Sequence, residues 1–139
     1  MDLKRVTIRA DGASLGNPGP AAIGATVKDT QGRLIASISR HIGQTTNNQA
    51  EYRALIAALE EAIRLGARVV DIALDSQLVV RQIRGEYRVK NAALQPLYQQ
   101  AKQLLDLLGC FTITHIPREQ NTEADDLASK AFKPPPATL

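Results

Sequence analysis

The sequence lacks tryptophan and has one cysteine and two histidines among its 139 residues. A single cysteine excludes a framework of internal disulfides, and we expect Cys110 to be a small buried residue. No run of about 18 apolar residues and no secretory signal pattern is present. The sequence therefore predicts a cytoplasmic protein that does not bind membranes.

The length and charge of the chain fit one small domain. At 139 residues, folding buries roughly two thirds of the surface of the unfolded chain, which is enough for a core. The net charge of +3 suits a polyanionic partner without requiring one. We predict a monomer with one domain over residues 1–132 and a proline-rich tail over 133–139.

Apolar periodicity predicts the order of the elements. Strands are expected at 4–11, 21–29, 33–43, 69–74 and 110–116, and helices at 47–65, 77–84, 92–108 and 122–132. The strand at 69–74 is nearly all apolar, which predicts burial on both faces. We predict an α/β fold in which a five-stranded mixed sheet, three antiparallel strands and then parallel ones, is flanked by helices.

Two acidic residues stand where predicted strands end. Asp11 closes the alternation of the first strand and is followed by glycine, small residues and an Asn-Pro-Gly turn. Asp75 directly follows the strand 69–74, at the carboxyl end where open α/β sheets carry their ligand sites. Another interpretation stays open, in which Asp75 or Ser76 only caps the next helix.

Two further acidic residues lie on predicted helices. Glu51 heads the apolar stripe of the helix 47–65, although that stripe otherwise faces the core. Asp125 lies beside the buried stripe of the last helix, whereas Asp126 is spaced to form a surface ion pair with Lys130. Asp125 is therefore the acidic residue expected to face inward.

Four such carboxylates require cations if they lie together in ionised form, because like charges raise one another's pKa. Oxygen ligands without a cysteine or histidine cluster favour Mg²⁺ or Mn²⁺ over zinc. The pattern is therefore typical of a phosphoryl-transfer enzyme in which carboxylates bridge two metal ions.

The chain resembles the type 1 ribonuclease H family in four stretches around these acidic residues. They are DGASLGNPGP with Asp11, TTNNQAEYRAL with Glu51, LDSQLVV with Asp75 and NTEADDLA with Asp125. The resemblance implies the ribonuclease H-like fold and a nuclease that hydrolyses the RNA strand of RNA/DNA hybrids, leaving 5′-phosphate and 3′-hydroxyl ends. It also implies that these four residues hold two Mg²⁺ or Mn²⁺ ions.

The resemblance further implies a set of substrate contacts. Small residues at 12–14 would let the main chain approach the RNA strand, whose 2′-hydroxyl distinguishes RNA from DNA. The implied contacts are Gly12, Ala13, Ser14, Asn17, Thr46, Asn47, Asn48 and Gln77. Helix capping by Thr46 or Asn47 and a turn role for Asn17 stay open as other interpretations.

The best-known bacterial members of the family carry an additional basic helix and loop, which this sequence lacks. In its place stands RQIRGEYRVKN, with the basic residues Arg81, Arg84, Arg88 and Lys90. These residues either contact phosphates of the hybrid or form an ordinary solvated surface.

The loop before the last helix resembles the shorter, archaeal-like subgroup of the family. Many members carry a histidine on this loop, whereas this sequence carries Arg118, which we expect to assist the reaction electrostatically. His115 alternates with Phe111 and Ile113 in a predicted strand, which indicates a structural role. We expect His41 to lie on the surface.

Two other functions fit the same pattern. One is a non-catalytic module that binds hybrids, and the other is a nuclease of the same fold that acts on double-stranded RNA or on DNA ends. The four acidic residues argue against the first, because binding alone does not require clustered carboxylates. The spacing of the motifs does not separate the substrates of the second.

Overall fold

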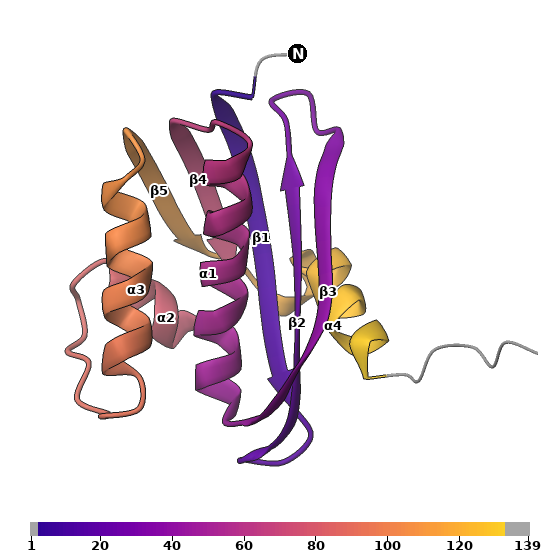
Figure 1. The fold of residues 1–139 in the computed structure, drawn as a ribbon, viewed down its shortest axis with the longest axis vertical. Helices are drawn as coiled ribbons and strands as arrows, with labels where there is room; N and C mark the ends of the chain where they lie inside the picture. Colours follow the sequence, from indigo (N-terminus) through magenta and orange to yellow (C-terminus); the bar gives the residue numbers. More distant parts are fainter. Residues whose placement is uncertain (1–2, 133–139) are drawn as a thin grey trace, which may run out of the picture.

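The computed structural model describes residues 3–132, and Figure 1 shows how their helices and strands are arranged. The strands are β1 (Arg5–Ser14), β2 (Gly19–Lys28), β3 (Leu34–Thr45), β4 (Val69–Leu74) and β5 (Cys110–His115). The helices are α1 (Asn47–Arg64), α2 (Gln77–Ile83), α3 (Gln95–Asp106) and α4 (Thr122–Ala131), with a short 3₁₀ helix η1 (Arg118–Gln120) before α4. The predicted tail at 133–139 lies outside the described residues.

The five strands form one mixed sheet in the order β3-β2-β1-β4-β5. β1 pairs antiparallel with β2, and β2 pairs antiparallel with β3. β4 pairs parallel with β1 and with β5. The predicted fold class, a mixed sheet in which an antiparallel meander is followed by parallel strands, is confirmed.

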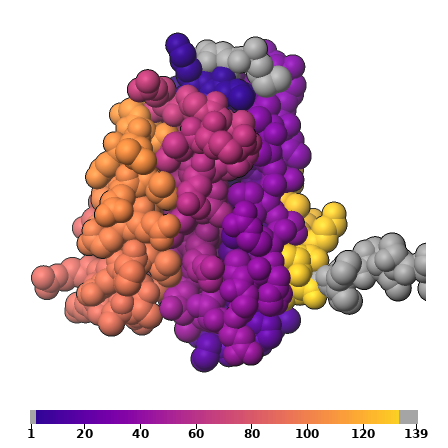
Figure 2. Space-filling model, viewed as in Figure 1, coloured from indigo at the N-terminus to yellow at the C-terminus, as the bar shows by residue number. Residues whose placement is uncertain are grey.

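Helices cover both faces of the sheet. Figure 1 shows α1 and α3 on one face and α4 on the other, beside β2 and β3. In the space-filling view of Figure 2, α3, α1 and the purple strands form the near surface, and α4 emerges at the right-hand edge. The predicted inward stripe of α1 is confirmed, because the residues that form it are all buried: Glu51, Leu55, Ala58, Leu59 and Ala62.

Two glycines allow helices to pack with their backbones directly against the sheet. A Cβ atom at Gly12 of β1 would lie 2.2 Å from the carbonyl carbon of Ala50 in α1. A Cβ atom at Gly24 of β2 would lie 2.1 Å from the carbonyl oxygen of Ala124 in α4. Gly12 follows Asp11 in β1, and Gly24 pairs with Asp11 in the sheet, so both close contacts lie beside Asp11.

The structure corrects three predictions about the strands. β1 does not end at Asp11 but continues to Ser14, because its pairing with β2 extends to Ala21. β4 is buried on one face only, since Asp71 on the other face is half-buried and pairs with Arg5 at 2.8 Å. Cys110 is exposed, because it opens β5 at the edge of the sheet.

The helix predicted over 92–108 is shorter, because an asparagine turn precedes it. The amide of Ala93 donates to the Oδ1 atom of Asn91 at 2.8 Å, and α3 begins at Gln95, next to Pro96. Among residues 3–132, no helix is both long and apolar enough to cross a bilayer.

Candidate active site

The register of the parallel pair places Asp75 next to Asp11. The last pair between β1 and β4 joins Ala10 to Leu74, and β4 ends there while β1 continues. Asp75 therefore leaves the sheet beside Asp11. The open question about capping is resolved, because the Ser76 hydroxyl accepts from the amide of Val79 and Asp75 does not cap α2.

Glu51 reaches the same place from the first turn and a half of α1. The helix start is fixed by a capping box, in which Thr46 and Gln49 each accept a hydrogen bond from the backbone amide of the other. The close packing at Gly12 then brings the amide of Glu51 against β1. The predicted cap at Thr46 is confirmed.

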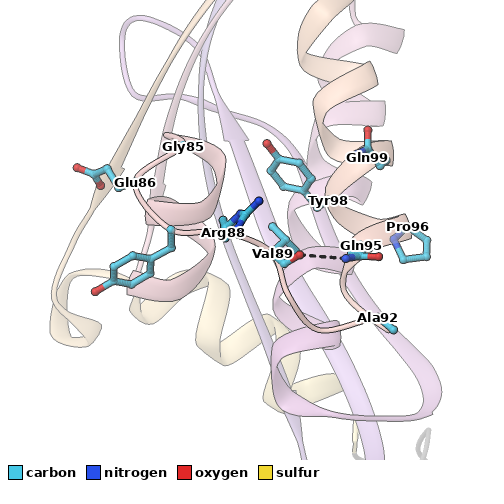
Figure 3. Close-up of a pocket in the computed structure, with 10 residues that line it drawn as sticks. Gly85, Glu86, Arg88, Val89, Ala92, Gln95, Pro96, Tyr98 and Gln99 are labelled. Carbon is cyan, nitrogen blue, oxygen red and sulfur yellow. Dashed lines mark hydrogen bonds between the residues drawn. The ribbon is translucent and has the colours of Figure 1, made fainter.

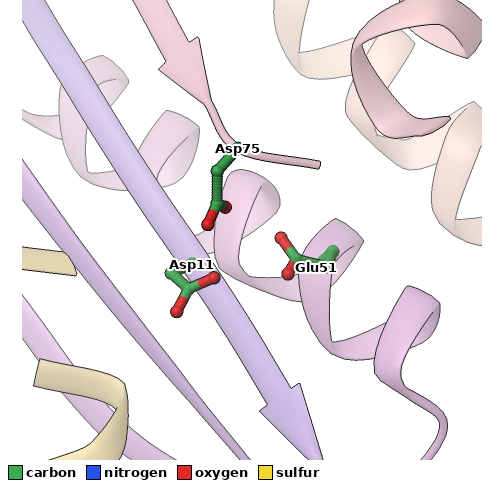
Figure 4. A group of neighbouring side chains, drawn as sticks. All are labelled: Asp11, Glu51 and Asp75. Atoms are coloured by element: carbon green, nitrogen blue, oxygen red, sulfur yellow. The ribbon is translucent and has the colours of Figure 1, made fainter. Parts of the chain in front are cut away.

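Figure 4 shows the side chains of Asp11, Glu51 and Asp75 pointing toward one another from β1, α1 and the end of β4. One carboxylate oxygen from each lies within 4.8 Å of the others. The three residues line a cavity of about 90 Å³, whose other lining residues are Gly12, Ala13, Asn47 and Arg118. Three carboxylate oxygens at this spacing are the ligand set that a hard divalent cation such as Mg²⁺ or Mn²⁺ takes.

The carboxylates of this cluster disfavour one another's ionisation. Burial, together with the charge of Asp75 and the hydrogen bond and charge of Asp125, raises the pKa of Asp11 to about 7. Burial and the charges of Asp11 and Asp75 raise the pKa of Glu51 well above its ordinary value. A bound cation would offset this repulsion, so the electrostatics of the cluster fit a metal site.

These shifted pKa values predict that the metal-free protein loses stability as the pH rises. Because the pKa of Asp11 is raised from 3.8 to about 7, the folded state binds more protons than the unfolded state between these values. The free energy of unfolding then falls across this window, by about 1.4 kcal/mol for each unit of pKa difference. Thermal unfolding of the chelator-treated protein at pH 5 and pH 8 measures this.

The matched control for the pH effect is Asp11→Asn, which cannot ionise. We expect its melting temperature to change less between pH 5 and pH 8 than that of the wild-type protein. Asp71, whose pKa is lowered by its hydrogen bond to Arg5, acts in a separate window below pH 4. Equal pH dependence in the two proteins would contradict a raised pKa at Asp11.

Asp125 approaches the cluster from α4, on the other face of the sheet. It lies near enough to Asp11 to raise the pKa of that carboxyl, but it is not one of the three residues whose oxygens converge. Its Oδ1 atom lies 3.7 Å from the guanidinium of Arg118, whose side chain is 78% exposed. Among residues 3–132 the predicted ion pair between Asp126 and Lys130 does not form.

The residues around the predicted turn after β1 bind to one another. The amide of Asn47 donates to Oδ1 of Asn17 at 3.0 Å, and the amide of Ser14 donates to Oδ1 of Asn47 at 3.3 Å. These bonds tie the turn between β1 and β2 to the start of α1. The side chains of Asn48 and Gln77, by contrast, are exposed at the first turns of α1 and α2.

Two of the four predicted basic residues near α2 form hydrogen bonds within the protein. Arg81 donates to the Tyr87 hydroxyl at 3.0 Å, with its guanidinium 5.1 Å from the ring centre, and Arg84 donates to the carbonyl of Ile113 at 3.0 Å. Arg88 and Lys90 are exposed on the connection that follows α2.

Beside this connection the surface is hollowed into an open groove of about 740 Å³. Figure 3 shows Arg88 and Val89 on the connection and Gln95 at the first turn of α3, where its side chain donates to the carbonyl of Val89. None of the clustered carboxylates lines it. The groove is therefore a separate feature of the face that carries the basic residues.

Both histidines are exposed. His41 contacts the ring of Phe132 edge-on, with 6.1 Å between ring centres, which confirms the surface position expected for it. His115 shares its side of β5 with Ile113, but it ends the strand and its side chain is exposed. A structural rather than a catalytic role for His115 stays a prediction.

Asn121, which precedes α4, is a residue beside the site to which the sequence pattern gives no role. Its side chain is 1% exposed and donates to the carbonyl of Ala10 at 3.0 Å and to Oδ1 of Asp75 at 3.4 Å. An asparagine four residues before Asp125 was visible in the sequence, but an asparagine at a helix start is ordinarily explained by capping.

The chain is similar to known proteins in both sequence and fold. A family model described as reverse transcriptase-like matches residues 9–131. Ribonuclease HI of Halobacterium salinarum is 44% identical over 92% of this chain and 64% of its own length. The chain belongs to the ribonuclease HI-like family.

Solved structures of family members resemble this fold closely. The crystal structure of RNase H1 from Halobacterium salinarum superposes with a TM-score of 0.90, at 44% identity over 92% of this chain and 97% of that one. LC11-RNase H1 in complex with an RNA/DNA hybrid superposes with a TM-score of 0.87, at 39% identity over 91% and 96% of the two chains.

Some relatives of this chain are much longer than the chain itself. A bifunctional protein of Mycobacterium tuberculosis is 44% identical over 92% of this chain but only 35% of its own length. The chain thus spans about a third of that relative.

Proposed function

We propose that this protein is a metal-dependent endoribonuclease that hydrolyses the RNA strand of RNA/DNA hybrids, leaving 5′-phosphate and 3′-hydroxyl ends. The observation that carries the proposal is the convergence of Asp11, Glu51 and Asp75 within 4.8 Å. Support comes from membership of the ribonuclease HI-like family and from the likeness to a relative whose structure holds an RNA/DNA hybrid.

We propose Asp11, Glu51, Asp75 and Asp125 as the residues that hold two Mg²⁺ or Mn²⁺ ions. When bound, such ions supply a water molecule of lowered pKa and neutralise charge on the leaving 3′ oxygen. The effect of Asp125 on the pKa of Asp11 places it close to the cluster and supports it as the fourth ligand. The cavity lining at Gly12 and Ala13 supports an approach of the substrate along the backbone of β1.

The remaining substrate contacts are proposed from where the side chains lie. Asn48 and Gln77 are exposed at helix starts next to Glu51 and Asp75, so sugars and base edges can reach them. Ser14, Asn17, Thr46 and Asn47 form a connected surface beside the cavity. Arg84, Arg88 and Lys90 are exposed and are proposed to contact phosphates further along the duplex.

One experiment tests the proposal against its alternatives. End-labelled RNA/DNA, RNA/RNA and DNA/DNA duplexes of the same sequence are incubated with the protein, with and without Mg²⁺. Cleavage of the RNA strand of the hybrid, dependent on metal, is expected. Binding of the RNA/DNA hybrid with no cleavage of any duplex would make the protein a hybrid-binding module. Cleavage of the RNA/RNA duplex would extend its substrates to double-stranded RNA.

Arg118 is expected to assist hydrolysis electrostatically. It lines the carboxylate cavity and lies 3.7 Å from Asp125. Because an arginine guanidinium keeps its charge in proteins, it cannot carry protons near neutral pH. Arg118→Ala should therefore lower kcat by about tenfold to a hundredfold, as for the loss of other groups that stabilise charge in the transition state. The pH profile of kcat should neither gain nor lose an ionisation near pH 6 to 7. Measurement of kcat against pH checks this.

His115→Ala is the matched comparison for Arg118→Ala, because both residues lie between Ile113 and α4 and both are exposed. We expect little change in kcat from the histidine variant. A fall in kcat confined to His115→Ala, with loss of an ionisation near the histidine pKa, would reassign the assisting role to the histidine.

Neutralising Arg88 or Lys90 should weaken hybrid binding for every sequence tested. Each phosphate contact contributes about one unit to the slope of log affinity against log salt, so each variant should lower that slope by about one. Titrations at several salt concentrations measure it. Arg33→Ala is the control, because Arg33 pairs with Asp29 in the turn between β2 and β3. In Figure 1 this turn lies at the opposite end of the molecule from the connection between α2 and α3. An unchanged slope in the Arg88 and Lys90 variants would mean that these residues only form solvated surface.

A further inference from the structure

Asn121 occupies the residue before α4 but does not cap that helix. Asparagine is among the residues most favoured at this position, because its side-chain oxygen accepts from the free amides of the first turn. Here no side-chain hydrogen bond caps α4. The Oδ1 atom is buried and has no hydrogen-bond partner among the described residues. The side chain is therefore held in an arrangement that lowers the stability of the helix start.

The side-chain amide nitrogen of Asn121 instead connects the start of α4 with β1 and with the end of β4. Nδ2 donates to the carbonyl of Ala10 in β1 at 3.0 Å and to Oδ1 of Asp75 at 3.4 Å. Ala10 is the neighbour of Asp11, and α4, which begins after Asn121, carries Asp125. One buried amide thus contacts Asp75 directly and fixes the start of α4 against the strand that holds Asp11.

A carboxylate whose orientation is fixed before a metal ion arrives binds that ion more tightly. Asp75 follows the last residue of β4, so sheet pairing does not hold it. The side chain of Asp75 is only half-buried, and the Asn121 amide is the hydrogen-bond donor that the described structure gives it. Groups that orient the ligands of a metal in this way typically contribute tenfold to a hundredfold to its affinity.

We infer that Asn121 is a positioning residue that orients Asp75 as a metal ligand, at the expense of the cap of α4. This inference rests on the proposed function, because it concerns the same metal site. It assigns no contact between Asn121 and the substrate. It predicts that the stability of the protein and its affinity for metal respond differently to substitution.

Asn121→Ser separates the two roles. Serine is also a good cap, but its side chain is one bond shorter than that of asparagine. The variant therefore favours capping of α4 and loses the hydrogen bond to Asp75. We expect the melting temperature of the metal-free protein to stay the same or rise. The dissociation constant for Mn²⁺, measured by calorimetry at neutral pH, should rise about tenfold. Asn121→Leu, which removes every polar atom, should weaken Mn²⁺ binding at least as much.

Ser39→Ala controls for general loosening of α4. The Ser39 hydroxyl donates to the carbonyl of Leu127 at 2.6 Å and ties α4 to β3 without contacting the acidic cluster. Its Mn²⁺ dissociation constant should match that of the wild-type protein. Unchanged Mn²⁺ affinity in Asn121→Ser and Asn121→Leu, or an equal loss in Ser39→Ala, would overturn the inference. If the wild-type protein binds no Mn²⁺, the proposed metal site fails, and the inference fails with it.

Discussion

Asp75→Asn should lower hydrolysis of the RNA strand by about 10²-fold to 10³-fold, the loss typical for removal of one preorganised electrostatic group. The change keeps the shape of the side chain but removes one of the three charges that converge within 4.8 Å. Binding of the hybrid should survive, because most phosphate contacts of a duplex lie away from the metal. Single-turnover cleavage in Mg²⁺, together with a binding titration in Ca²⁺ or without metal, measures the two quantities separately.

The matched control for this variant is Asp126→Asn, which removes the same charge from an exposed position on α4. Asp126 forms no ion pair in the described part of the chain, so its neutralisation should change the rate less than twofold. Asp125→Asn, one residue away, should resemble Asp75→Asn. If Asp126→Asn greatly lowered the rate of hydrolysis while Asp125→Asn stayed active, the fourth ligand would be Asp126. Full activity of Asp75→Asn would contradict the proposed metal site.

The sequence predicts those parts of the site that depend on local pattern. The position of Glu51 on the inward face of α1 follows from helical periodicity, and the cap at Thr46 follows from residue preference. Asp75 follows a strand whose apolar run is unmistakable. These features survive in the structure because each depends on residues within about one helical turn or one strand.

Features that depend on contacts between distant segments escape the sequence. The extension of β1 past Asp11 depends on a partner strand seven or more residues away, and alternation alone does not reveal it. The exposure of Cys110 and His115 follows from the place of β5 at the edge of the sheet. The orientation of Asn121 toward Asp75 depends on three segments that meet only in the folded chain.

Gly12→Ala should destabilise the protein and impair hydrolysis together. A Cβ atom at this position would lie 2.2 Å from both the carbonyl carbon and oxygen of Ala50 and 2.5 Å from the amide of Glu51. These are backbone atoms, so no side-chain rotation relieves the contact, and α1 must move away from β1. Overpacking of this kind costs about 1–3 kcal/mol of unfolding free energy. A displacement of Glu51 by about 1 Å should lower the rate of hydrolysis about 10²-fold.

Gly32→Ala separates this packing effect from the general cost of replacing glycine. Gly32 lies in the turn between β2 and β3 with φ 80° and has no heavy atom within 4 Å of an added Cβ. Its substitution should cost about 1–2 kcal/mol through backbone conformation and leave hydrolysis unchanged. Denaturant unfolding and steady-state kinetics on both variants also decide what Gly12 does. If Gly12 served only the approach of RNA to the main chain, Gly12→Ala would raise KM at unchanged stability; because the glycine is buried against α1, we expect lower stability, weaker Mn²⁺ binding and a lower kcat instead.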